Sequence, residues 1–376
     1  MSGKKLIVVA AGGTGGHLFP AQALAEVLVD RGYVVHLMTD ERVRDYGKNF
    51  PAEKIHIIPA ASPSPSLSKL HLLPGRLLRL YSGYRKAKSL LKSLRPIAVV
   101  GFGGYPSFPP VFAAKSLGIP TAVHEQNAVL GRANRVLASR ADFVATSFQD
   151  TQGIPAEAAH KVAFTGNPVR AIALLQARSP YPKIAADLPI TLVVFGGSQG
   201  ARIFSDFMPH VFEAMPQELR RRIKLVQQCR TEDIAQSQAT YRQMGVSAEL
   251  NTFFPDMPKR LAEAHLVVCR AGASSIAELG VIGRPAALVP LPHAIDNDQL
   301  RNAQSFASAG AGWVFPQGEL NAAEFAKFLT GLMVDGQVLK RAAAAALNHG
   351  VPDAAARLAE LTISLASSRA ALENKI

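Results

Sequence analysis

Four glycine-rich stretches contain the residues of this sequence whose types and spacing could do chemistry. They occupy residues 12–17, 101–107, 196–200 and 270–275, and each follows a run of apolar residues. Glycines at such positions let backbone N–H groups approach an anion, and the N-terminus of a following helix adds positive potential. One such stretch is also compatible with a tight turn that binds nothing. Four in one chain predict a cleft between two domains that binds anionic groups.

His17 is the residue beside these glycines that can exchange protons near neutral pH. It begins a predicted helix, and we expect it to be functional, whereas His36 and His56 lie on predicted strands and are expected to be structural. The first stretch does not match the dinucleotide-binding pattern Gly-x-Gly-x-x-Gly, because the frame that starts at Gly13 ends at Leu18. A nucleotide-linked oxidoreductase is therefore the weaker interpretation.

The sequence offers no competing catalytic pattern. It has no Gly-x-x-x-x-Gly-Lys-Ser/Thr, and its histidines lack the paired i, i+4 spacing with a carboxylate partner that metal sites use. Cys229 and Cys269 form no Cys-x-x-Cys pair and fit a reducing compartment. No stretch reads as a signal peptide or a transmembrane helix. We therefore expect a soluble protein of the cytoplasm with no metal and no cofactor.

Strands and helices must position the glycine-rich stretches, and the sequence indicates them by alternating apolar runs with helical patterns. This alternation predicts doubly wound parallel α/β domains. Prolines between 167 and 188 predict a linker that separates a first domain, 1–166, from a second, 189–352, and an Ala-rich closing helix within 353–376 is expected to join the first. The predicted strands are 6–10, 34–38, 97–100, 121–123 and 143–145 in the first domain, and 191–195, 224–227, 266–268 and 286–289 in the second. Predicted helices include 20–31, closed by Gly32, and 276–282.

The positive charge of the chain is concentrated in one segment. Of the formal net charge of +13, ten charges come from residues 54–124, which contain ten Lys and Arg and no Asp or Glu. Between residues 67 and 94 these cations alternate with leucines and tyrosines. One interpretation is one or two amphipathic helices with a solvated basic face. The other is a peripheral contact with an anionic membrane. Nucleic acid is disfavoured, because the segment has no row of aromatics for base stacking and no binding motif is present.

The order of the motifs resembles a known family. Residues 12–17 read Gly-Gly-Thr-Gly-Gly-His, 101–107 Gly-Phe-Gly-Gly-Tyr-Pro-Ser, 124–127 His-Glu-Gln-Asn, 165–170 Thr-Gly-Asn-Pro-Val-Arg, 196–200 Gly-Gly-Ser-Gln-Gly and 270–275 Arg-Ala-Gly-Ala-Ser-Ser. This series closely resembles the MurG family of bacterial peptidoglycan glycosyltransferases over residues 6 to about 315. The resemblance implies a GT-B fold of two facing Rossmann-like domains. It also implies metal-free, inverting transfer of N-acetylglucosamine (GlcNAc) from UDP-GlcNAc to the C4 hydroxyl of undecaprenyl-diphospho-N-acetylmuramoyl-pentapeptide (lipid I), which gives lipid II.

The resemblance also implies roles for individual residues. His17 would be the general base, with Glu125 as the alternative. One departure from the family is Asp298, which leaves the sugar-edge hydrogen bonding at this position open. The donor-binding residues would be Thr14, Gly15, Gly16, Asn127, Arg170, Ser198, Phe254, Arg270, Ala273, Ser274, Ser275, Glu278 and Gln299. The acceptor diphosphate would be bound by Gly13, Gly103, Gly104, Tyr105 and Asn134.

A lipid-linked acceptor favours the membrane interpretation of the basic segment. The expected location is the cytoplasmic face of the inner membrane, held peripherally, with cell-wall synthesis proteins as expected partners and roles in cell shape and division. Two alternatives stay open: a GT-B transferase acting on another membrane lipid such as diacylglycerol, and a non-catalytic module that binds phosphate lipids. The expected membrane contacts are Leu72, Leu73, Arg76, Leu77, Arg79, Leu80, Tyr84 and Arg85.

Overall fold

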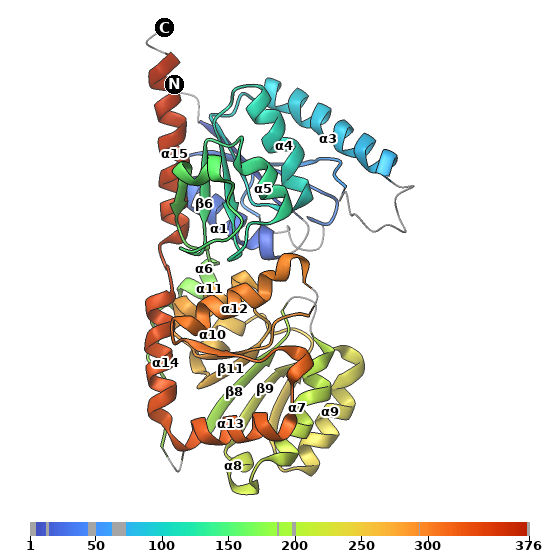
Figure 1. The fold of residues 1–376 in the computed structure, drawn as a ribbon, viewed down its shortest axis with the longest axis vertical. Helices are drawn as coiled ribbons and strands as arrows, with labels where there is room; N and C mark the ends of the chain where they lie inside the picture. Colours follow the sequence, from blue (N-terminus) through green and yellow to red (C-terminus); the bar gives the residue numbers. More distant parts are fainter. Residues whose placement is uncertain are drawn as a thin grey trace. The chain divides into compact units, whose positions relative to one another are not determined.

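The computed structural model divides the chain into two compact units. The first, the N-terminal unit, comprises Met1–Arg170 and Asp353–Ile376, and the second, the C-terminal unit, comprises Ala171–Pro352 (Figure 1). The structure describes residues 5–12, 15–43, 50–61, 73–185, 188–197, 201–292 and 294–373, without the side chains of residues 73, 295 and 368–373. Among these residues, no helix is both long and apolar enough to cross a bilayer.

The N-terminal unit is built on a sheet whose described strands are all parallel. Their order is β3-β2-β1-β4-β5-β6-β7, so the strand order reverses between β1 and β4. In open α/β sheets, ligands bind beyond the carboxyl ends of the strands at such a reversal. The strands are β1 (Leu6–Ala10), β2 (Val34–Thr39), β3 (Lys54–Ile57), β4 (Ala98–Gly101), β5 (Thr121–Glu125), β6 (Phe143–Thr146) and β7 (Val162–Phe164).

Helices cover both faces of this sheet. Ile7 and Val9 of β1 pack with α1 and α15, whereas Val8 and Ala10 pack with α3, α4 and α5. Because neighbouring strand residues point to opposite faces, β1 is apolar throughout. The helices are α1 (Gly15–Asp30), α3 (Leu73–Leu94), α4 (Gly104–Ser116), α5 (Arg132–Ala138), the 3-10 helix η2 (Ala156–Lys161) and α15 (Ala354–Glu373).

The C-terminal unit repeats this plan. Its described strands are parallel in the order β10-β9-β8-β11-β12-β13, with the reversal between β8 and β11. The strands are β8 (Ile190–Phe195), β9 (Ile223–Gln228), β10 (Ser247–Asn251), β11 (Leu266–Cys269), β12 (Ala286–Leu288) and β13 (Gly312–Val314). The helices are α6 (Ala171–Leu174), α7 (Arg202–Ala214), α8 (Gln217–Arg221), α9 (Thr231–Gln243), α10 (Met257–Glu263), α11 (Ala273–Ile282), η3 (Ile295–Asn297), α12 (Asp298–Ser308), η4 (Gln317–Glu319), α13 (Ala322–Val334) and α14 (Gly336–His349).

The prediction of two doubly wound parallel sheets is confirmed, and the central strands match their predicted runs. The outer strands β7, β10 and β13 were not predicted, and β3 was expected only as the strand position of His56, because these strands are only partly buried and carry no continuous apolar run. Two helices begin earlier than expected: α1 at Gly15 and not Pro20, and α11 at Ala273 and not Ile276. Gly, Pro and Ser are weak helix formers, so the local sequence did not predict these first turns as helical.

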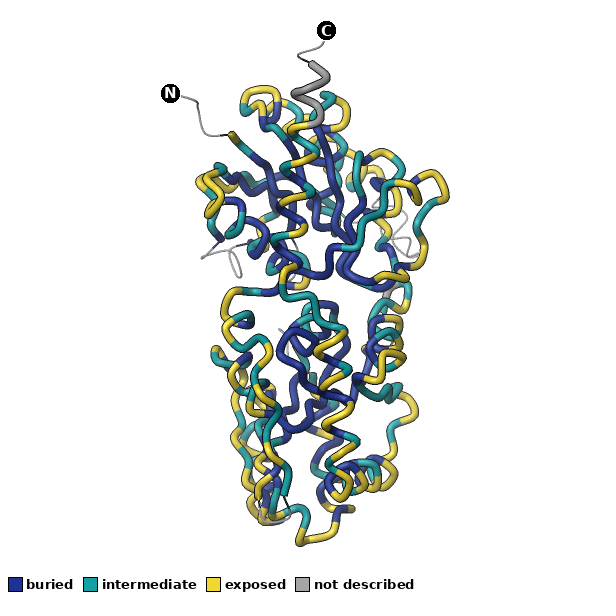
Figure 2. The backbone as a smooth tube through the Cα atoms, turned by 90° about the vertical axis from the view of Figure 1, so that its left-hand side faces the viewer, coloured by how far each residue is buried: buried dark blue, intermediate teal, exposed yellow. Residues whose placement is uncertain are grey.

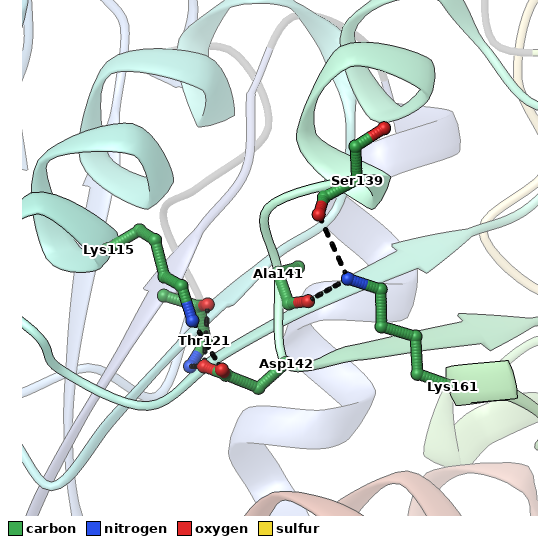
Figure 3. A network of polar contacts seen from close by, with 6 residues as sticks. All are labelled: Lys115, Thr121, Ser139, Ala141, Asp142 and Lys161. Atoms are coloured by element: carbon green, nitrogen blue, oxygen red, sulfur yellow. Dashed lines mark hydrogen bonds and ion pairs between the residues drawn. The ribbon is translucent and has the colours of Figure 1, made fainter. Parts of the chain in front are cut away.

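A polar network secures the ends of β5 and β6 that lie opposite the ligand edge. The Asp142 carboxylate accepts hydrogen bonds from Thr121 N (2.9 Å), from Thr121 Oγ1 (3.1 Å) and from Lys115 Nζ, while Lys161 donates to the carbonyls of Ser139 and Ala141 (Figure 3). Burial disfavours the charged form of Asp142, but the bonds from Lys115 and Thr121 outweigh it and lower the pKa of this carboxyl. The stabilisation is therefore present above the unfolded carboxyl pKa and is lost as the pH falls through the lowered value.

The central strands of both units are buried, while exposed residues gather on helices and turns (Figure 2). Among the helices, α3 is unusual because its first half is exposed. Figure 1 shows this end of α3 extending past α4, and Leu77, Leu78 and Tyr81 on it are 57%, 67% and 58% exposed. Farther along, Ala87 and Leu91 are buried against the unit. The second half of α3 therefore packs against the N-terminal unit, and its first half is exposed.

Candidate active site

The reversal point of the N-terminal sheet brings His17 against a second glycine-rich loop. His17 lies in the first turn of α1, after β1, and Gly103 and Gly104 follow β4. A Cβ atom on Gly104 would lie 3.3 Å from His17 Cδ2 and 3.5 Å from Nε2. Gly103 and Gly104 have φ angles of +77° and +68°, which side-chain-bearing residues rarely adopt. Both glycines are therefore needed for α4 to begin beside the imidazole.

The other edge of the His17 ring faces the end of β5. His17 Nδ1 lies 2.8 Å from Gln126 Oε1, and Gln126 Nε2 lies 2.9 Å from Nδ1 of the buried His124. Sequence reasoning did not single out either residue. A signal was available, since residues 124 and 126 are two apart at a strand end and so share one face. Burial lowers the pKa of His124 to about 4, which keeps its ring neutral near neutral pH.

Glu125, the alternative base, has a different position. Its side chain is buried, and Oε1 accepts hydrogen bonds from Asn127 N (3.0 Å) and Nδ2 (3.2 Å). Oε2 accepts from Gly131 N and Asn134 Nδ2, both at 2.9 Å. A carboxylate that already accepts four hydrogen bonds has its lone-pair positions occupied and little capacity left to accept a substrate proton. The structure therefore favours His17 over Glu125 as the base.

The remaining candidate residues of the N-terminal unit differ in the contacts that their side chains make. Asn134 is buried and donates to His124 O (3.1 Å) as well as to Glu125, so its amide nitrogen supports the loop. Tyr105 is the second residue of α4. The Arg170 guanidinium lies 4.9 Å above the Phe19 ring, which places it beside α1. Gly15 and Gly16 open α1, while Gly13 and Thr14 lie outside the described residues.

In the C-terminal unit the loop after β11 leads into the N-terminus of α11. The first backbone N–H groups of a helix have no partner within it and attract anions. Here Gly272 precedes the helix with no side-chain cap, and Ala273, Ser274 and Ser275 form its first turn. The Ser274 hydroxyl is buried with no hydrogen-bond partner among the described residues. This first turn therefore offers unpaired donors of the kind that bind phosphate.

Arg270 holds this loop in place. One terminal nitrogen, Nη1, donates to the carbonyls of Val289 (3.1 Å) and Pro290 (3.0 Å), and Nη2 donates to Gln317 Oε1 (2.6 Å). Its Nε atom is buried without a partner in the described part of the chain. Burial lowers the pKa of Arg270. The guanidinium therefore joins the end of β11 to the loop after β12, and its Nε and the second N–H of Nη2 make no hydrogen bond within the described residues.

The other donor-side candidates lie on elements next to this loop. Glu278 is 8% exposed on α11, one turn beyond Ser274. Gln299 Oε1 accepts from Leu291 N (2.9 Å), which ties the start of α12 to the loop after β12. Phe254 is buried, its carbonyl accepts from Met257 N (3.2 Å), and its ring lies under the Arg260 guanidinium. Ser198 lies outside the described residues.

Asp298, the departure from the family pattern, begins α12. Its Oδ1 accepts a hydrogen bond from Gln299 N at 2.7 Å. The two residues before it, Asp296 and Asn297, have φ angles of +59° and +52°. Such values strain side-chain-bearing residues and recur at functional sites. In the part of the chain that the structure describes, no three His, Cys, Asp or Glu side chains are grouped so that they could hold a metal ion.

Comparison with known proteins decides the family. Residues 7–146 match the N-terminal domain of glycosyltransferase family 28, and residues 191–358 match its C-terminal domain. A protein of Methylorubrum extorquens is 48% identical over 364 residues, which cover 96% of this chain and 98% of the relative. Its name is UDP-N-acetylglucosamine–N-acetylmuramyl-(pentapeptide) pyrophosphoryl-undecaprenol N-acetylglucosamine transferase. A protein of Rhizobium leguminosarum bv. trifolii with the same name is 46% identical over 99% of this chain and 98% of its own length.

The chain belongs to the MurG family of glycosyltransferases. The crystal structure of Acinetobacter baumannii MurG is similar to it, with a TM-score of 0.78 and 29% identity over 96% of this chain and 99% of that one. A UDP-GlcNAc 2-epimerase from Neisseria meningitidis, with a TM-score of 0.66 at 14% identity, shares the fold alone. The predictions of a GT-B fold and of a glycosyltransferase are therefore confirmed. For a MurG-family chain, the loops after β1, β4, β5 and β11 are the candidate active-site elements.

Proposed function

We propose that this chain transfers GlcNAc from UDP-GlcNAc to the C4 hydroxyl of lipid I and so forms lipid II. The observation that carries the proposal is the placement of His17 at the reversal of the N-terminal sheet, with Nε2 facing the glycine-bounded start of α4. Relatives at 45–48% identity over nearly their whole length bear the name of this activity. Both the donor and the acceptor carry a diphosphate, which matches the two sets of glycine-rich strand ends.

The chemical step needs a base and a stabilised leaving group. The acceptor hydroxyl oxygen attacks the anomeric carbon from the face opposite UDP and loses its proton to His17 Nε2. At the same time the bond between this carbon and the UDP oxygen breaks, and UDP departs with the electron pair. The anomeric configuration is inverted. Negative charge that builds on the diphosphate is stabilised by the N–H groups at the start of α11 and by Arg170.

Each unit supplies one binding function in this proposal. On the C-terminal unit, the first turn of α11 binds the donor diphosphate, Glu278 accepts hydrogen bonds from the ribose hydroxyls, and the Phe254 backbone meets the uracil. Gln299 forms hydrogen bonds with the GlcNAc hydroxyls. On the N-terminal unit, the glycines at the starts of α1 and α4 bind the acceptor diphosphate. This division follows the positions of the helix N-termini within each unit.

A radiolabel-transfer assay tests the proposed function. We expect purified protein to move labelled GlcNAc from UDP-GlcNAc to a lipid I analogue, and unlabelled UDP-galactose to compete poorly as a donor. Transfer to diacylglycerol in place of lipid I would indicate the alternative acceptor. Absence of transfer to any acceptor, with UDP-GlcNAc still bound, would indicate a binding module and contradict the proposal.

The acceptor's lipid requires the chain to approach a membrane, and we assign this contact to the first half of α3. Leu77, Leu78 and Tyr81 are exposed there beside the basic Arg79 and Arg85. Leucines of this kind enter the lipid interface while cations meet anionic head groups. The proposed location is the cytoplasmic face of the inner membrane, where lipid II synthesis contributes to cell shape and division.

The structure changes the expected set of membrane contacts. Tyr84 is half-buried, donates a hydrogen bond to Ser116 Oγ (3.1 Å) and packs edge-on against Phe112 at 5.7 Å, because it lies on the face of α3 that meets α4. Leu80 is also half-buried. Leu72 and the side chain of Leu73 lie outside what the structure describes. The proposed surface therefore keeps Arg76, Leu77, Arg79 and Arg85 and gains Leu78 and Tyr81.

Charge reversal on α3 is expected to weaken membrane binding. In the triple variant Arg76→Glu, Arg79→Glu, Arg85→Glu, partitioning onto anionic vesicles should fall by about a hundredfold or more, since each basic residue near such a surface contributes about 1 kcal/mol. Vesicle co-sedimentation measures this. Transfer to a short-chain, soluble acceptor should be retained.

The matched control reverses three exposed cations of the C-terminal unit, as Lys327→Glu, Lys340→Glu, Arg341→Glu. It changes the net charge equally and should leave partitioning within about threefold of the parent, because these cations lie on α13 and α14, outside the proposed membrane surface, and act only through a screened long-range field. Equal losses in both triple variants would show a general charge effect and contradict the assignment to α3.

A further inference from the structure

We infer that Gln126 and His124 fix the proton of neutral His17 on Nδ1 and thereby leave the lone pair of Nε2 to act as the base. The inference rests on the proposed function for the role of His17, but the tautomer itself can be observed without substrate. In this scheme Gln126 and His124 are positioning residues, since they act through His17.

The chain of hydrogen bonds begins at a backbone carbonyl that can only accept. His124 Nε2 lies 3.0 Å from Gly166 O, so Nε2 of His124 must carry a proton. The ring is fully buried and neutral, and a neutral imidazole has one donor and one acceptor. Nδ1 of His124 is therefore an acceptor.

A second carbonyl fixes the orientation of the Gln126 amide. Its Nε2 donates both to His124 Nδ1 (2.9 Å) and to the backbone oxygen of His124 (3.0 Å). In the flipped orientation the amide oxygen would face that carbonyl oxygen and the lone pair of Nδ1, so three acceptors would meet in a buried place. Gln126 is 1% exposed, so water does not relieve this conflict. Oε1 must then face His17.

The last step concerns His17. Its Nδ1 lies 2.8 Å from Gln126 Oε1, an acceptor, so this nitrogen must donate and carry the proton. In the neutral ring, Nε2 then holds the lone pair. The same edge of the ring faces Gly104 and the start of α4, where a side chain on residue 104 would obstruct it. The arrangement resembles the part of a catalytic triad that orients its histidine, with a neutral amide in place of a carboxylate.

The tautomer can be read by two-bond proton–nitrogen correlation spectra of the free protein labelled with nitrogen-15 in histidine. Among the ten histidines, the signals of His17 are assigned by their loss in His17→Asn. We expect the spectrum of the neutral His17 ring in the wild-type protein to show Nδ1 protonated and Nε2 unprotonated. A wild-type spectrum with the proton on Nε2 of His17 would overturn the inference.

Two substitutions at position 126 extend the test. Gln126→Leu removes the acceptor, so His17 should show mixed tautomers and kcat should fall by about two- to tenfold, which is the bias that one net hydrogen bond gives. The donor KM should change little. Gln126→Glu keeps an oxygen toward His17 and should keep the Nδ1 proton. An unaltered tautomer and an unaltered kcat in Gln126→Leu would contradict the inference.

The matched control is Gln227→Leu in the C-terminal unit. Gln227 is likewise buried at a strand end, where it accepts from Tyr241 Oη at 2.7 Å. Its loss should reduce thermal stability by a similar amount without altering the His17 spectrum. If wild-type protein shows the expected tautomer but transfers no GlcNAc, the proposed function fails while the tautomer assignment stands. The two failures are thus distinguishable.

Discussion

Replacing His17 with alanine is expected to lower kcat by about 10²–10⁴-fold while the KM for UDP-GlcNAc changes by less than about threefold. A positioned general base contributes about this factor to the rate. The donor KM is spared because His17 lies on the N-terminal unit, whereas the proposed donor contacts are mainly on α11 and its neighbours. Steady-state transfer kinetics with a soluble lipid I analogue measure both constants.

The control for this variant is His160→Ala, an exposed histidine of η2 in the same unit. It removes an imidazole without touching the reversal point and should retain at least about half of the parent kcat, as substitutions at exposed positions usually do. A His17→Ala enzyme with an elevated KM and an unchanged kcat would show that His17 binds substrate and is not the base.

Replacing Glu278 with alanine is expected to raise the KM for UDP-GlcNAc by about 10–100-fold. Hydrogen bonds to a charged group contribute about 1.5–3 kcal/mol, which corresponds to this range. The carboxylate lies on α11, one turn from the proposed diphosphate contacts, and the ribose of UDP is bonded directly to that diphosphate. Calorimetric titration with UDP should show the same loss of affinity, because UDP contains the ribose.

A substitution elsewhere on the same unit provides the comparison. Glu263→Ala changes an exposed carboxylate at the end of α10 and should leave UDP affinity within about twofold of the parent. If Glu278→Ala binds UDP as tightly as this control, the ribose contact is wrong. In that case the buried carboxylate serves the packing of α11, which a lower melting temperature with unchanged affinity would reveal.

The sequence predicted more of the framework than of the side-chain geometry. Strands such as β1 and β11, buried on both faces, are continuous apolar runs and were predicted at nearly their observed bounds. The outer strand β10 was missed, because one side of it is exposed and its local pattern is mixed. A strand can be predicted from its local sequence where burial on both faces requires apolar residues throughout. An edge strand with one exposed face has no such requirement.

Within the site, residue type identified candidates without ranking them. The motif at residues 124–127 placed Glu125 beside His17 as a rival base, and only burial and four hydrogen-bond donors separate the two. Arg270 was expected to contact the donor, yet Nη1 donates to two backbone carbonyls and Nη2 donates to the Gln317 side chain. The direction of a side chain depends on which elements pack beside it, and that information is spread over distant parts of the chain.

By itself, the sequence determined two doubly wound domains, the glycine-rich strand ends, the concentration of charge between residues 54 and 124, and the family. These properties are local, because they depend on residue type and on spacing along the chain. Only the tertiary structure decided that Gln126 faces His17 across 109 positions, and that Tyr84 packs on α4 while Leu77 is exposed. Such choices depend on hydrogen-bond partners and burial that long-range packing supplies, since a buried polar group must find its partner wherever the fold places one.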